Sequence, residues 1–99
     1  MRKDLLRLAN QVAAGELGII LGCRKIQAYR FELADDLDED FLPFIGVDSQ
    51  TDHLPVDEER RNWSLEALAR KDIEIADAEE HFRDEVLSAC KKIIARFDY

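Results

Sequence analysis

The sequence predicts an all-α protein, a small antiparallel bundle of three or four helices with a long ordered loop between the second and third. Apolar residues recur at helical spacing near both ends of the chain, and the last such pattern covers about 25 residues. The apolar segment between them contains Pro43, which excludes a central strand. Ninety-nine residues make a single domain over residues 1–99.

Two helices are predicted in the first third of the chain. Apolar residues at helical spacing indicate a first helix over residues 3–14, and Gly15 is a stop or a kink. A second helix is expected from Glu16 to about Leu33, either separate from the first or continuous with it. Gly18 and Gly22 lie four residues apart on one face, which predicts a close contact with another helix.

Residues 34–56 interrupt the helical pattern. DDLDED is typical of a solvated connection, and FLPFIGV is expected to lie as an extended piece over the helices. A structureless connection of about twenty residues is unusual in a small domain, so the segment is expected to be an ordered loop, a functional element, or both.

Two more helices are predicted after this loop. Asp57 is a suitable N-cap for a third helix, with Glu58 and Glu59 at the positive end of its dipole. Asp72 is a suitable cap for a fourth. The fourth helix has one apolar face, formed by Ile75, Ala78, Phe82, Val86, Ala89, Cys90, Ile93 and Phe97.

The net charge of −8 is concentrated in the middle of the chain. Residues 32–59 contain eleven acidic residues and no Lys or Arg, whereas the remaining residues carry eleven acids and fourteen bases. Such a field disfavours nucleic acid and favours a basic partner or cations, although acidic loops also serve solubility.

The composition also bears on location and on the thiols. No apolar run approaches the length of a membrane span, and polar residues interrupt the start of the chain where a signal peptide would be apolar, so we expect a cytoplasmic protein. Cys23 and Cys90 each lie within an apolar helical pattern and are expected to be buried free thiols, with no zinc-binding spacing.

The stretch FIGVDSQTDHLP holds the first candidate site. Asp48, Asp52 and His53 have the ligand types of a divalent cation site, but their spacing matches no calcium loop. The alternative is that Asp48, Ser49 and Asp52 bond nearby backbone amides and shape turns.

A second candidate surface follows immediately. Glu58, Glu59, Arg60 and Trp63 combine acidic residues with the Arg and Trp types that dominate binding hot spots. The alternative is that Trp63 anchors a helix in the core while Arg60 and Arg61 neutralise nearby carboxylates. We find no motif for nucleophilic catalysis, phosphate binding or nucleic-acid recognition, and we expect no cofactor.

Three pieces of the sequence, GELGIILGCRKI, DEDFLPFIGVDSQTDHLP and the RRNW that follows, resemble a group of short bacterial proteins of unknown function. The resemblance implies a bacterial cytoplasmic protein and brings no catalytic residues.

The leading hypothesis is a small acidic module that binds a basic protein, and an immunity-type protein that masks a basic toxin is a sharper form of it. The alternatives are a ligand or metal site in residues 44–55 and a homodimer through the last helix.

Overall fold

The computed structural model describes residues 1–34 and 38–99, and the regular secondary structure in these residues is helical. The elements are α1 (Arg2–Ala13), α2 (Ile19–Gln27), α3 (Arg30–Leu33), α4 (Leu42–Thr51), the 3₁₀ helix η1 (Asp57–Asn62) and α5 (Leu65–Phe97). The all-α prediction is therefore confirmed. Residues 35–37, part of the expected DDLDED connection, lie outside the described residues.

The first two helices are separate, which answers the question that the sequence left open. Gly15 has φ of +78°, a left-handed conformation that glycine adopts without steric cost, and it ends α1 as predicted. The expected helix from Glu16 to Leu33 is shorter and interrupted. Its first residues form the turn after α1, and Ala28 and Tyr29 separate α2 from the four-residue α3.

The prediction of a long loop over residues 34–56 was wrong, because this segment contains the ten-residue helix α4. Pro43 lies in its first turn, where the missing N–H group costs no intrahelical hydrogen bond. Phe44, Val47 and Thr51 share one face of α4 and are buried. The apolar residues of FLPFIGV thus reach the core at helical spacing and not as an extended piece.

The division into a third and a fourth helix was also wrong. Residues 57–62 form the 3₁₀ helix η1, and one helix of 33 residues then runs from Leu65 to Phe97. Its N-cap is Ser64, whose hydroxyl accepts a hydrogen bond from the Ala67 N–H at 3.1 Å. Asp72 lies inside α5 and caps nothing.

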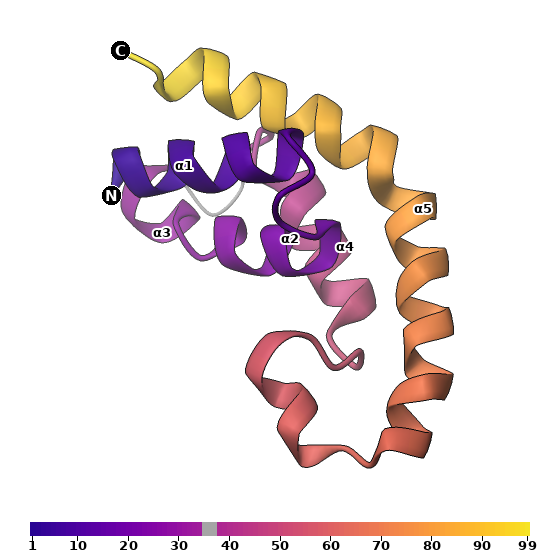
Figure 1. Cartoon of the computed structure of the whole chain (residues 1–99). Coiled ribbons are helices and arrows are strands. Elements are labelled where there is room, and N and C mark those ends of the chain that lie inside the picture. The colour runs from indigo at the N-terminus through magenta and orange to yellow at the C-terminus, as the bar shows by residue number, and fades with distance from the viewer. Residues whose placement is uncertain (35–37) are drawn as a thin grey trace.

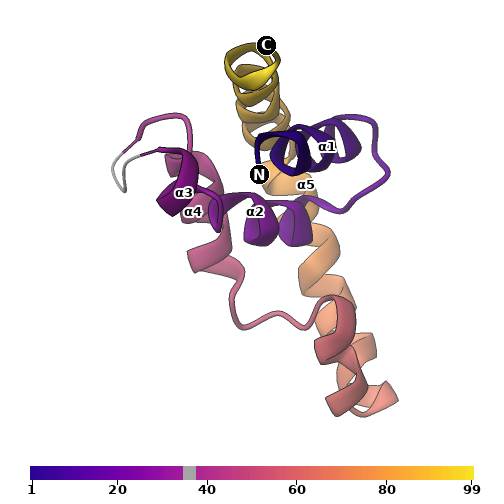
Figure 2. The ribbon, with the colours of Figure 1, turned by 90° about the vertical axis from the view of Figure 1, so that its left-hand side faces the viewer.

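The core lies between α1, α2, α4 and the C-terminal half of α5 (Figures 1 and 2). α1 runs along that half of α5, and α2 lies between α1 and α4 (Figure 2). The predicted apolar face of the last helix is buried from Val86 onward, at Val86, Ala89, Cys90, Ile93 and Phe97, and Phe82 is partly buried against the core. Cys23 and Cys90 are free and buried, as predicted, and burial raises the pKa of the Cys90 thiol to about 11.

The N-terminal half of α5 leaves this body. We define the arm as residues 57–85, which comprise η1, the connection to α5 and the first part of that helix. No residue from Asp57 to Glu85 is buried. In Figure 1 the arm extends below the body. Its two elements, η1 and the first part of α5, are joined by the turn before Leu65. A helix of 33 residues therefore has a core to pack against along only part of its length.

The predicted close contact is present at Gly22. It distinguishes Gly22 from Gly46, the glycine within α4. A Cβ atom at Gly22 would lie 2.3 Å from Cγ2 of Val12, whereas a Cβ at Gly46 in α4 would have no atom within 4 Å. α1 and α2 can approach this closely because residue 22 has no side chain.

We expect Gly22→Ala to lower the free energy of unfolding by about 1–3 kcal/mol, since Val12 and the α1–α2 spacing must adjust to the extra methyl group. Gly46→Ala, the matched control, is expected to raise it by about 0.5–1 kcal/mol through the higher helix propensity of alanine. Urea unfolding followed by circular dichroism measures both. An equal effect of the two substitutions would contradict the close contact.

Candidate functional site

The seven predicted site residues lie between the middle of α4 and the residue before the N-cap of α5, and the structure divides them into two groups. Asp48, Glu59 and Arg60 form ion pairs with other elements. Asp52, His53, Glu58 and Trp63 are exposed. The side chains that we expected to act together therefore have different roles.

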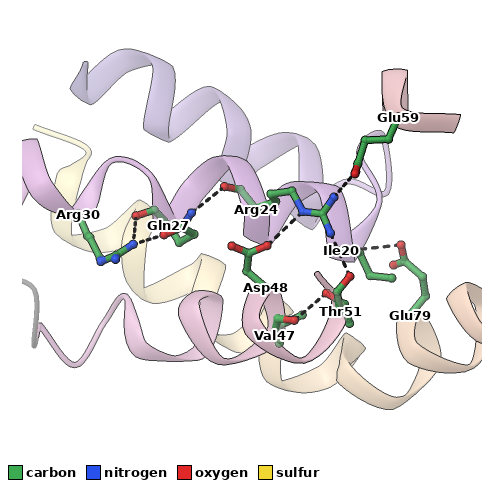
Figure 3. A network of polar contacts seen from close by, with 9 residues as sticks. All are labelled: Ile20, Arg24, Gln27, Arg30, Val47, Asp48, Thr51, Glu59 and Glu79. Carbon is green, nitrogen blue, oxygen red and sulfur yellow. Dashed lines mark hydrogen bonds and ion pairs between the residues drawn. The ribbon is translucent and has the colours of Figure 1, made fainter. Parts of the chain in front are cut away.

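Arg24 on α2 joins three segments, and sequence reasoning did not identify it. Its Nε lies 3.1 Å from Oδ1 of Asp48, and its Nη1 lies 2.5 Å from Oε1 of Glu59 (Figure 3). Its Nη2 donates to the Thr51 carbonyl at 3.0 Å. The guanidinium supplies several donors in one plane, so a single side chain connects α2 with both ends of the segment that leads from α4 to η1.

The low exposure of Arg24 and Asp48 indicates that their contact stabilises the fold and is not a binding site. Its side chain is 23% exposed and that of Asp48 is 22% exposed, so both charges are largely removed from water and compensate each other. Asp48 lies within α4 and faces α2. The interpretation that Asp48 shapes a turn was wrong, and its carboxylate is not presented to an external cation or partner.

A second long-range contact fixes the start of α2. The carboxylate of Glu79 on α5 accepts hydrogen bonds from the N–H groups of Ile19, at 2.6 Å, and Ile20, at 3.3 Å. The N-cap residue of α2 is Gly18, which has no side chain to satisfy these donors. A Cβ at Gly18 would lie 3.0 Å from Oε1 of Glu79, so glycine leaves room for the carboxylate of this distant residue.

A third contact holds η1 to α5. Arg60 donates to both carboxylate oxygens of Asp72, with Nη1 to Oδ1 at 2.7 Å and Nη2 to Oδ2 at 3.1 Å. The Arg60 hydrogen bonds hold the pKa of Asp72 below its ordinary value. Nearby, Nε2 of His53 lies 4.0 Å from a carboxylate oxygen of Glu74. The expectation that Arg60 neutralises a carboxylate is confirmed, and its partner is the residue that we had expected to cap a helix.

The geometry gives no support to a cation site in residues 44–55. Asp48 is turned toward Arg24, while Asp52 and His53 are exposed at the C-terminal end of α4. In residues 1–34 and 38–99, no group of three or more His, Cys, Asp or Glu side chains is placed to hold a metal ion. A hollow of about 790 Å³ occurs elsewhere, lined by residues of α1, α2 and α3, and its lining includes Asp4, Arg7, Lys25 and Glu32, which carry both signs of charge.

The arm carries the exposed surface that sequence reasoning missed. Leu65 is 86% exposed, Ile73 is 66% exposed and Trp63 is 36% exposed, so Trp63 does not anchor a helix in the core. Leu65, Ala69, Ile73 and Ala76 follow one another at spacings of four, four and three residues, and we call them the outer stripe. This spacing was available in the sequence, but these positions lie off the apolar face that continues into the core.

The arm is also strongly acidic. Residues 57–85 contain eleven Asp or Glu residues and five Arg or Lys residues, a formal charge of −6. Four of these acidic residues, Glu66, Asp77, Glu80 and Asp84, lie on α5 and outside the predicted acidic span of residues 32–59.

Comparison of the chain with protein-family models, with curated proteins and with solved structures gives no match. Within the described part of the chain, no helix has both the length and the apolar character needed to cross a membrane.

The Arg24 contacts predict a specific loss of stability. We expect Arg24→Gln to lower the free energy of unfolding by about 1–2 kcal/mol, since Asp48 and Glu59 lose their charged donor and the Thr51 carbonyl loses its bond. Lys25→Gln removes the same charge from an exposed neighbour and is expected to change stability by less than about 0.5 kcal/mol. Urea unfolding at low salt measures both, and equal values would show that Arg24 acts only through net charge.

Proposed function

We propose that the protein is a small, acidic, cytoplasmic protein-binding module whose arm presents the surface for a basic protein partner. The observation that carries this proposal is the arm itself. From Asp57 to Glu85 no residue is buried, yet the segment carries three exposed large apolar residues and a formal charge of −6.

The energetics of the arm favour a partner. Isolated helices are marginal in water, and most helical stability in proteins comes from packing an apolar face. The N-terminal half of α5 instead exposes Leu65 and Ile73 while polar links attach it to the rest of the chain. Covering these side chains with a second protein would supply the packing that the body does not.

The ion pairs are the reason that we place the partner surface on the arm and not on the whole acidic span of residues 32–59. Asp48 and Glu59 are compensated by Arg24, Asp72 by Arg60, and Asp38 and Asp40 by Arg96. Among the described residues, Asp77, Glu80 and Asp84 take part in no ion pair, and all three are exposed. Their field would steer a basic partner toward the arm, and apolar contacts would then hold it.

An immunity-type protein that masks a basic toxin surface is one form of this proposal, and the resemblance to short bacterial proteins is compatible with it. The outer stripe also favours a second candidate, a homodimer through α5, which would cover Leu65 and Ile73 with a second copy. Sedimentation of the purified protein over a range of concentrations separates the two.

The direct test uses two variants that remove the same number of charges. The arm variant combines Glu66→Gln, Asp77→Asn, Glu80→Gln and Asp84→Asn. The matched control combines Glu16→Gln, Glu32→Gln, Glu39→Gln and Asp98→Asn, which are exposed carboxylates outside the arm. Proteins captured from native lysate by wild type are identified, purified and returned to binding measurements with each variant.

We expect a basic partner that binds wild type and the control, binds the arm variant at least about tenfold more weakly, and loses affinity as salt increases. Circular dichroism establishes that both variants are folded. A purified partner that binds the arm variant as tightly as wild type would overturn the proposal.

A further inference from the structure

We propose that the segment of the partner that binds the arm is a basic amphipathic helix, which packs its apolar face on the outer stripe of α5. This inference rests on the proposed function and names the partner's structure and chemistry.

The outer stripe has the form of a helix-packing surface. Its four residues follow one side of α5 over about 17 Å, at 1.5 Å per residue. The large exposed side chains of Leu65 and Ile73 alternate with Ala69 and Ala76, which are also exposed. Such an alternation leaves depressions between ridges, into which the side chains of a second helix fit.

Acidic residues line one flank of this stripe. At 100° per residue, Glu66, Asp77 and Asp84 lie beyond Ile73 on one side of the outer stripe, whereas Glu80 lies between Ala69 and Ile73, and all four are exposed. Glu66 has Arg70 at 3.5 Å in a pair whose side chains are mostly exposed, and such pairs contribute little. A helix lying on the stripe would place its flanking Lys or Arg residues against these carboxylates.

The charge distribution favours this occupant over the alternatives. A second copy of the arm would bring its own acidic flank and a formal charge of −6 toward the first, which repels it. An anionic membrane surface is repelled for the same reason. A peptide that binds by adding a β-strand needs a sheet edge, and the regular structure in residues 1–34 and 38–99 is helical.

The test uses two synthetic peptides of equal length and charge. The first is a helix with Leu on one face and Lys on the other. The second keeps every Lys and replaces each Leu with Gln. Fluorescence anisotropy measures binding of each peptide to the whole chain, and amide chemical shifts of the labelled protein locate the contact.

Two double variants accompany the peptides. Leu65→Gln with Ile73→Gln removes the large residues of the outer stripe. Phe31→Gln with Leu42→Gln removes two exposed apolar residues of the body and is the matched control.

We expect the Leu/Lys peptide to shift amides of residues 65–84 and to bind the stripe variant at least about tenfold more weakly than wild type, since two apolar side chains no longer become buried. The body variant should bind within about twofold of wild type. Equal binding of both peptides, or tight binding to the stripe variant, would overturn the amphipathic helix and leave the acidic surface intact.

Two other results would also overturn the inference. Failure of both peptides to bind at low salt would contradict the proposed function as well, because the acidic arm would then attract no basic helix. A wild-type dimer that becomes monomeric in the stripe variant would assign the stripe to a second copy of the chain.

Discussion

The structure depends on the packing of the C-terminal half of α5 against α1, α2 and α4. Val86, Cys90, Ile93 and Phe97 are the residues through which the last helix joins the core, and the elements between α1 and α4 are arranged around them. The helix begins at Leu65 and its first buried residue is Val86, and among the twenty-one residues before Val86 only Phe82 is an apolar residue that packs against the core. The arm is a consequence of this offset between the length of the helix and the extent of the core.

Polar contacts hold the arm where apolar packing does not. Glu79 bonds the first N–H groups of α2, Arg24 reaches Glu59 at η1, and Arg60 reaches Asp72 on α5. These contacts are directional, so they fix an orientation, but each lies at least partly in solvent and contributes less than buried apolar area would. The arm is thus oriented by charge and leaves its apolar residues available.

Local patterns in the sequence predicted the parts of the fold that local patterns determine. The all-α class, the first helix, the apolar face from Val86 to Phe97 and the buried cysteines followed from helical spacing. Helix α4 was missed because FLPFIGV, which contains Pro43 and Gly46, was interpreted as an extended piece, although proline is tolerated in a first turn and a side chain at Gly46 would meet no other atom within 4 Å. The boundary at Asp72 was wrong because a good capping residue also occurs inside helices.

The candidate site was harder to predict, because its residues are defined by contacts across the chain. Arg24 is 24 residues from Asp48 and 35 from Glu59, and nothing in its neighbourhood marks it as their partner. Seven residues chosen for their chemistry therefore separated into structural ion pairs and exposed side chains. The helical spacing of Leu65 and Ile73 was detectable in the sequence. Whether a second apolar stripe on one helix is buried or exposed can be determined only when the extent of the core is known.

Hydrogen–deuterium exchange along α5 tests most directly whether this helix has one packed half and one unsupported half. We expect the amides of residues 86–97 to be protected together with those of α1, and the amides of residues 69–78 to exchange on the order of 100-fold faster, since no apolar residue in that range packs against the core. Equal protection along the whole helix would contradict this division and would show that the arm is packed in the isolated protein.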